Sequence, residues 1–181
     1  MTHRLSRRLD QLETATERLL ASAEALGPRA HTRPGPGQWS AAQVVHHLLV
    51  TETAIIGQVE KKLSQAATGR PSLTDSLQAL LVRVALRLPG VRVRAPRGVG
   101  ELTEAAAIGP LLALRAEWAA TRRRLERLLN ELPGSHLHQS VFRHPRAGMM
   151  TIEQTLTFML DHVLHHQQQL GRIASQLRIK N

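Results

Sequence analysis

Aliphatic residues recur every three or four positions along several segments of the chain, which is the spacing of the buried face of an α-helix. The last such segment runs from Thr151 to Arg178. Two histidines interrupt its aliphatic pattern. His166 lies on the predicted buried face and His162 lies one helical turn before it, so the two imidazoles project side by side. The predicted buried face consists of Ile152, Leu156, Met159, Val163, His166, Leu170, Ile173 and Leu177.

Further helices follow from the same spacing and from the residues that begin and end helices. Gly27 and Pro28 end the first helix. The tetrapeptides Ser40–Gln43 and Thr151–Gln154 are capping boxes, in which the first and fourth residues satisfy each other's backbone N–H groups as a helix begins. The predicted helices before the last one span Leu5–Leu26, Ser40–Leu63, Leu73–Leu88 and Pro110–Leu132, with a long irregular crossover over Val91–Gly109.

The fold class that these elements predict is all-α. No segment alternates apolar and polar residues with a period of two, so the sheet content is expected to be near zero. A chain of 181 residues is long enough for one domain with a substantial core. We therefore expect a single domain over residues 1–181, folded as a four-helix bundle with long crossover connections. Folds of this kind build metal sites in the bundle interior.

The paired histidines of the last helix are candidate metal ligands, but two ligands do not complete a site. The helix that follows Ser40 offers His46 or His47 as a third. His47 is favoured because it lies three residues after the aliphatic Val44, although the angular difference is too small for the sequence to decide. Three imidazoles would leave a coordination position for water, as in catalytic zinc sites. On spacing alone, hydrogen-bonded histidines without a metal ion are an equal alternative.

The composition limits the chemistry and the partners of the protein. The chain contains no Cys, which excludes disulfides, thiolate metal ligands and a cysteine nucleophile. Its net charge is +10, but the arginines are spread over the predicted helices and there is no Tyr to stack on bases, so nucleic acid is not expected as a partner. Neither a signal peptide nor an apolar run of membrane-spanning length is present. We therefore expect a cytoplasmic protein that does not contact the membrane.

Three motifs resemble those of the DinB-like superfamily, which includes the DinB/YfiT-like metal-dependent hydrolases. The segment from Gly37 to Leu48, GQWSAAQVVHHL, resembles the family's G-x-W-S-x-x-[EQ]-x-x-x-H-L. The segment from His144 to Thr151, HPRAGMMT, resembles H-P-x-x-G-x-x-[TS]. The segment Asp161–His166, DHVLHH, resembles the closing H-x-x-H-H helix. The motifs occur in the family's order and span nearly the whole chain, so together they are more specific than any one of them.

The resemblance implies a four-helix bundle that holds a divalent metal ion, nickel or zinc, through three histidines, which correspond here to His47, His162 and His166. It implies a homodimer that acts on a small-molecule substrate, either as a metal-dependent hydrolase or as a transferase of a low-molecular-weight thiol such as bacillithiol or mycothiol. A non-catalytic metal-binding stress or scaffold protein is the alternative. The chain departs from many relatives at Gln167–Gln169, which follow the histidine pair. This departure puts the contacts around the ligands in doubt.

The residues near the three histidines are expected to have structural or surface roles. Asp161 and Glu52 are predicted to be solvated carboxylates rather than partners of the histidines. His165 falls outside the aliphatic face and is predicted to contact solvent or a partner. Trp39 is predicted to pack in the core. His144 either anchors its loop or lines the mouth of the site, and no catalytic residue is assigned.

Overall fold

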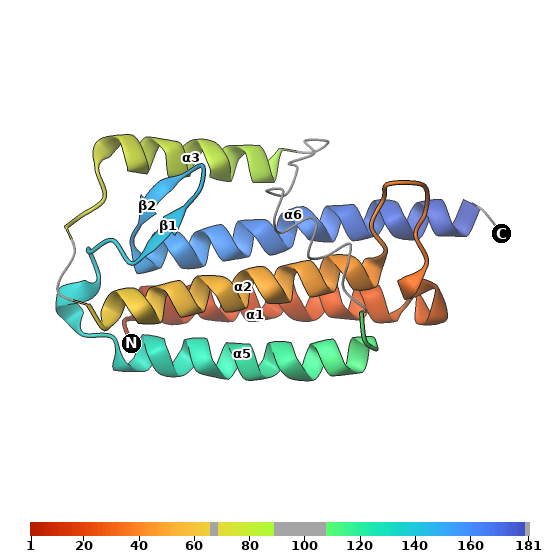
Figure 1. The fold of residues 1–181 in the computed structure, drawn as a ribbon, viewed down its shortest axis with the longest axis horizontal. Helices are drawn as coiled ribbons and strands as arrows, with labels where there is room; N and C mark the ends of the chain where they lie inside the picture. The colour runs from red at the N-terminus through yellow and green to blue at the C-terminus, as the bar shows by residue number, and fades with distance from the viewer. Residues whose placement is uncertain (66–68, 89–107, 180–181) are drawn as a thin grey trace.

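The structure, a computed structural model, describes residues 1–65, 69–88 and 108–179. Four long helices run side by side along its length, namely α1 (His3–Glu24), α2 (Ala41–Leu63), α5 (Leu111–Glu131) and α6 (Ile152–Ile179). Figure 1 shows that α1 and α6 run in one direction and that α2 and α5 run in the other. The predicted all-α four-helix bundle is confirmed. The crossover predicted over Val91–Gly109 lies outside the described residues, except for its last two positions.

Capping boxes begin α2 and α6, as the sequence predicts. At α2, the backbone N–H of Gln43 donates to Ser40 Oγ over 3.2 Å, and the N–H of Ser40 donates to Gln43 Oε1 over 2.9 Å. At α6, the same two bonds join Thr151 and Gln154 over 3.3 and 2.9 Å. Each box satisfies backbone donors that the first turn of a helix cannot satisfy itself. The boxes therefore fix where each helix begins, and with it the position of the histidines further along.

The buried face of α6 is the one that the sequence predicts. All eight of its predicted residues are buried, with exposed fractions between 0 and 7%. They pack mainly against α1, whose Leu12 and Leu19 are fully buried, and also against α2. His47 of α2 and His166 of α6 lie within this core at 4 and 7% exposure. The bundle therefore places imidazoles where aliphatic side chains would otherwise pack.

A short β-hairpin precedes α6, although the sequence predicts almost no sheet. Strand β1 (Phe142–His144) pairs antiparallel with β2 (Gly148–Met150), and Phe142 lies opposite Met150. Gly148 has a φ of +68°, a conformation that other residues rarely adopt. The Met149 N–H donates to Asp75 Oδ1 over 2.9 Å, which ties the hairpin to the neighbouring helix. Strands of three residues are too short to produce a detectable alternation of apolar and polar positions.

A further helix, α3 (Leu73–Arg87), lies outside the four-helix bundle and packs on α6 and β2 (Figure 1). Its inner side binds α6 through polar groups. Asp161 is fully buried and forms ion pairs with Arg83 over 3.1 Å and with Arg87 over 2.7 Å. The Nδ1 of His165 donates to the Leu86 carbonyl oxygen over 3.1 Å. The predictions that Asp161 is solvated and that His165 contacts solvent or a partner are therefore wrong.

Candidate metal centre

His47 from α2 and His162 and His166 from α6 converge inside the bundle. One ring nitrogen of each lies within 4.8 Å of a ring nitrogen of the other two. The Nε2 atoms of His162 and His166 are 3.1 Å apart. The ring centroid of His47 lies 5.3 Å from that of His162 and 5.0 Å from that of His166. Between the two alternatives that the sequence leaves open in α2, the structure places His47 in the cluster and leaves His46 out of it.

The donor atoms suit a divalent ion. Two nitrogens that bind one tetrahedral zinc ion at about 2.0–2.1 Å lie about 3.3 Å apart, which is close to the observed 3.1 Å. The Nδ1–H of His166 donates to Gln169 Oε1 over 2.7 Å, and this bond leaves the lone pair on Nε2, where it can coordinate. The Nδ1 of His47 is buried and has no hydrogen-bond partner among the described residues. Of the buried ring nitrogens in this cluster, the Nδ1 of His47 is therefore the one that the described residues leave unsatisfied, while the Nε2 atoms of His162 and His166 contact each other.

Burial keeps the cluster uncharged at neutral pH. Desolvation lowers the pKa of His47 to about 4, and the neighbouring His46 contributes to the shift. Desolvation also lowers the pKa of His166 to about 3, with a contribution from His47. The pKa of His162 lies well below 6.5 because of burial and because of the two other histidines. Neutral imidazole is the form that binds metal ions, so protons do not compete for these nitrogens at pH 7.

Aromatic rings surround the histidine cluster. The Trp39 ring lies 4.9 Å from that of His47, between centroids, and the Phe158 ring stacks on His162 at 5.6 Å and 15°. The ring of His144 also contacts Phe158, with 4.6 Å between the centroids. Trp39 packs against the core as predicted, but it also forms a wall of the cluster. His162 is half-buried, whereas His47 and His166 are buried.

His144 is held by its own loop. Its Nδ1 accepts hydrogen bonds from the backbone N–H groups of Arg146 over 3.1 Å and of Ala147 over 3.0 Å. Burial lowers the pKa of His144 to about 4, so its imidazole is neutral and carries its proton on Nε2. The sequence left loop anchoring and a place at the mouth of the site as alternatives. The structure shows the anchoring and also places the ring one aromatic residue away from His162.

Glu52 is buried, so the prediction of a surface carboxylate is wrong. It is 4% exposed and accepts a hydrogen bond from Arg122 of α5 over 2.8 Å. Desolvation raises the pKa of Glu52, and the charge of Arg122 opposes this shift. This carboxylate is bonded to a guanidinium and not to a histidine of the cluster. Its contact instead joins α2 to α5.

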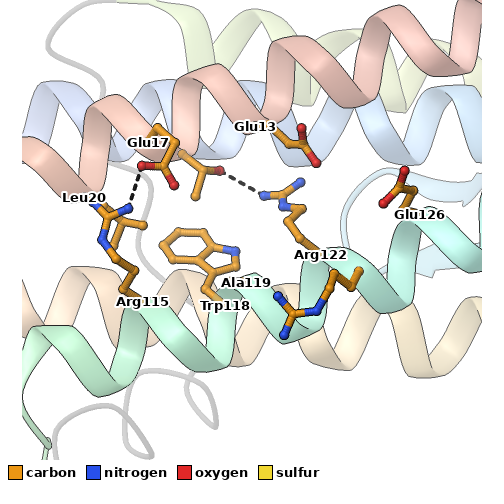
Figure 2. Close-up of a pocket in the computed structure, with 10 residues that line it drawn as sticks. Glu13, Glu17, Leu20, Arg115, Trp118, Ala119, Arg122 and Glu126 are labelled. Atoms are coloured by element: carbon orange, nitrogen blue, oxygen red, sulfur yellow. Dashed lines mark hydrogen bonds and ion pairs between the residues drawn. The ribbon is translucent and has the colours of Figure 1, made fainter.

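A separate cavity of about 250 Å³ lies between α1 and α5. Figure 2 shows Arg115, Trp118 and Arg122 of α5 facing α1, with Glu17 near Arg115 and Glu13 near Arg122. Arg115 forms an ion pair with Glu17 over 2.6 Å, and Arg122 donates to the hydroxyl of Thr16 over 2.9 Å. None of the three clustered histidines lines this cavity. The candidate metal centre therefore lies on the α2–α6 side of the bundle, apart from this cavity.

Comparisons with known proteins agree with this arrangement. The family model of the DinB superfamily matches residues 11–170. The chain belongs to the DinB superfamily. Its fold is similar to that of YfiT from Bacillus subtilis, which is described as a probable metal-dependent hydrolase with an unusual four-helix bundle topology. That match has a TM-score of 0.55 and 20% sequence identity, and it covers 98% of this chain and 90% of YfiT. No curated protein matches the chain.

Two residues of this DinB superfamily member contact the cluster in ways that the sequence did not predict: Gln169 was named only as part of the glutamine run, and Phe158 was not named. Gln169 lies three residues after His166, a spacing at which side chains on a helix meet, so it could have been found from position alone. Phe158 lies one turn before His162, and its apolar side chain reads as ordinary core. The sequence left open what the glutamines after the histidine pair contact. For Gln169 the structure answers this, because its side chain accepts a hydrogen bond from His166 and orients that ring.

Proposed function

We propose that this DinB superfamily member is a metal-dependent enzyme in which His47, His162 and His166 hold one divalent ion, nickel or zinc. The observation that supports the proposal most directly is the convergence of three imidazole nitrogens within 4.8 Å of one another. The lowered pKa values and the Gln169 bond support it further, because both favour the neutral, coordinating form of the rings. The fold that the chain shares with YfiT agrees with a metal-dependent activity.

The chain's own residues would prepare the site for chemistry. An ion held by three imidazoles supplies Lewis acidity and an exchangeable coordination position. Gln169 holds His166 in the tautomer that can coordinate. Trp39 and Phe158 shield the imidazoles from water on two sides, while the half-buried His162 leaves a side through which a small-molecule substrate could enter.

The reaction that we propose is hydrolysis or the transfer of a low-molecular-weight thiol to an electrophile. Two carboxylates lie near the histidines in the sequence, but Asp161 and Glu52 are each bonded to arginine. Both are held by these arginines, and neither forms a hydrogen bond with a clustered histidine within the described residues. A thiol loses its proton more easily than water, so it needs less help from a base. This difference favours thiol transfer, and the thiol must come from outside because the chain contains no Cys.

A turnover screen tests the proposed activity. Protein loaded with nickel or zinc is incubated with bacillithiol or mycothiol and an electrophile, and separately with ester and amide substrates. We expect turnover that is lost in His166→Ala and retained in His46→Ala, a matched control whose imidazole lies outside the cluster. Circular dichroism verifies that both variants keep their helices. Metal binding without turnover in any arm would favour the non-catalytic stress or scaffold protein.

We further propose that the protein is a homodimer, and we retain a cytoplasmic location as a prediction from the sequence. The homodimer is supported by a row of exposed aliphatic side chains on α3, which includes Leu77 and Leu81 at 58 and 60% exposure. None of the helices in the described part of the chain is both long and apolar enough to cross a membrane. Analytical ultracentrifugation tests the homodimer through the mass of the particle in solution.

A further inference from the structure

The outer face of α3 carries large aliphatic side chains that the described part of the protein leaves exposed. Their exposed fractions lie between 48 and 91%. At about 100° of rotation per residue, they share an arc of about 100° on the side opposite Ala79 and Leu86, the two buried residues of the helix. This outer face consists of Leu73, Leu77, Leu80, Leu81, Val84 and, directly after the helix, Leu88.

The charged side chains of α3 are bonded to the body of the protein instead. Arg83 and Arg87 form ion pairs with the buried Asp161, and Asp75 accepts a hydrogen bond from the Met149 N–H. A helix at a free surface normally has the opposite arrangement, with its apolar side inward and its charges in water. A continuous exposed apolar patch of this kind marks an interaction surface. The outer face of α3 therefore has the character of a surface that is buried in an assembly.

We propose that the outer face of α3 binds the α3 of a second copy of this chain, with the two helices antiparallel about a two-fold axis. Successive residues of the face are separated by 4, 3, 1, 3 and 4 positions, a series that reads the same in both directions. With the two-fold axis between Leu80 and Leu81, Leu77 would lie opposite Val84 of the partner subunit. In the same way, Leu73 would lie opposite Leu88 of the partner subunit. A two-fold interface requires such self-complementarity, because each contact occurs twice.

The charge of the protein favours this face over others for self-association. The chain has a net charge of +10, so two copies repel each other wherever unpaired arginines would meet. The outer face of α3 contains no charged residue, and Arg83 and Arg87 at its edge are bonded to Asp161.

A pairing of the α3 helices would also stabilise the position of the candidate metal centre. The inner side of α3 binds Asp161 and His165, which are adjacent in the chain to His162 and His166. The inference specifies the surface of the homodimer proposed above and rests on that proposal.

Disulfide trapping tests the antiparallel arrangement. Because the chain contains no Cys, the introduced thiols are the only ones that can form a disulfide. Leu77→Cys and Val84→Cys proteins are oxidised separately and as a mixture. In the antiparallel pair, the two copies of position 77 are seven residues apart along the axis, about 10 Å, which exceeds the Cα separation of about 7 Å that a disulfide can span. We therefore expect a cross-linked dimer only in the mixture. Efficient cross-linking of each variant alone would overturn the antiparallel arrangement.

Sedimentation tests the surface itself. We expect the wild-type protein to sediment as a dimer and the Leu77→Glu/Leu81→Glu variant as a monomer with unchanged helix content. Leu112→Glu is the matched control, because Leu112 is 76% exposed but lies on α5, and this variant is expected to remain dimeric. A wild-type monomer at every concentration would refute the homodimer itself. A double variant that stays dimeric would leave the homodimer intact and show that another surface forms it.

Discussion

Acidification should destabilise the metal-free protein through its clustered histidines. In the folded state, burial lowers the pKa of His47 to about 4 and that of His166 to about 3. In the unfolded state, histidine titrates near about 6.5. As the pH falls below 6.5, these histidines therefore bind protons in the unfolded state but not in the folded state. The free energy of unfolding decreases as the pH is lowered. The loss continues until the pH reaches the folded pKa values.

The magnitude of this effect follows from the two shifts. At pH 5, about 97% of each unfolded histidine is protonated, whereas the folded His47 and His166 remain mostly neutral. Each residue then lowers the free energy of unfolding by about 2 kcal/mol relative to pH 7. His162 adds a loss of the same sign, because its pKa is also lowered. A total of at least about 4 kcal/mol is a large part of the about 5–15 kcal/mol that stabilises a typical domain.

Urea denaturation of the chelator-treated protein at pH 7, 6 and 5 measures the effect. His166→Gln removes one buried imidazole, so this variant should lose about 2 kcal/mol less than the wild type between pH 7 and 5. His3→Gln, a change at an exposed histidine, should lose as much as the wild type. Glu52, whose pKa is raised by burial, also makes the stability depend on pH. Because every variant keeps Glu52, this contribution is the same in all of them and cancels in the comparison. An equal loss in the wild type and in His166→Gln would refute the reasoning.

Three further substitutions test other parts of the structure. Glu52→Gln should lower the free energy of unfolding by about 3–5 kcal/mol in urea denaturation, because it leaves Arg122 buried without its ionic partner. Gly148→Ala should cost about 1–3 kcal/mol in the same assay, because the φ of +68° is unfavourable for alanine and its Cβ would clash with Asp75 Oδ1. Asp161→Asn should speed amide hydrogen exchange in α3, because it weakens both ion pairs that hold this helix.

Each of these substitutions has a matched control. Glu60→Gln removes a partly exposed partner of Arg124 and should cost no more than about 1 kcal/mol. Gly171→Ala lies in α6 with open space around it, so it should be neutral or stabilising. Glu153→Gln weakens only an exposed ion pair and should leave exchange in α3 unchanged. Equal effects in a substitution and its control would contradict the structural reason given for that substitution.

The parts of the structure that the sequence predicts correctly depend on interactions between residues close in the chain. The capping boxes at Ser40 and Thr151 join residues three positions apart, and the buried face of α6 follows from helical spacing alone. The same locality places His162 and His166 side by side. The convergence of His47 with them was expected from the pattern of α2 and from the resemblance to the DinB-like superfamily. The pattern of α2 alone could not decide between His47 and His46, because their angular positions differ too little, and only the resemblance named His47.

The wrong predictions concern polar side chains whose partners are distant in the sequence. Glu52 bonds to Arg122, 70 residues away, and Asp161 bonds to Arg83, 78 residues away. His165 bonds to a backbone carbonyl 79 residues away, and a carbonyl group carries no sequence signal. A charged residue in an isolated helical pattern reads as solvated, because burial of a charge is unfavourable without a partner. Where the partner lies on another element, the burial becomes predictable only once the packing of the helices is known.

The metal stoichiometry of the protein and of five single-histidine variants tests the central claim most directly. Metal-free protein is equilibrated with nickel or zinc, freed of unbound ion by gel filtration and analysed for metal by mass spectrometry. The account predicts one ion per chain in the wild type, and a loss of this ion in His47→Ala, His162→Ala and His166→Ala. It predicts full retention in His46→Ala and His165→Ala, whose imidazoles lie outside the cluster. A wild-type protein that retains no ion, or an ion retained by all five variants, would contradict the claim that these three histidines form a metal site.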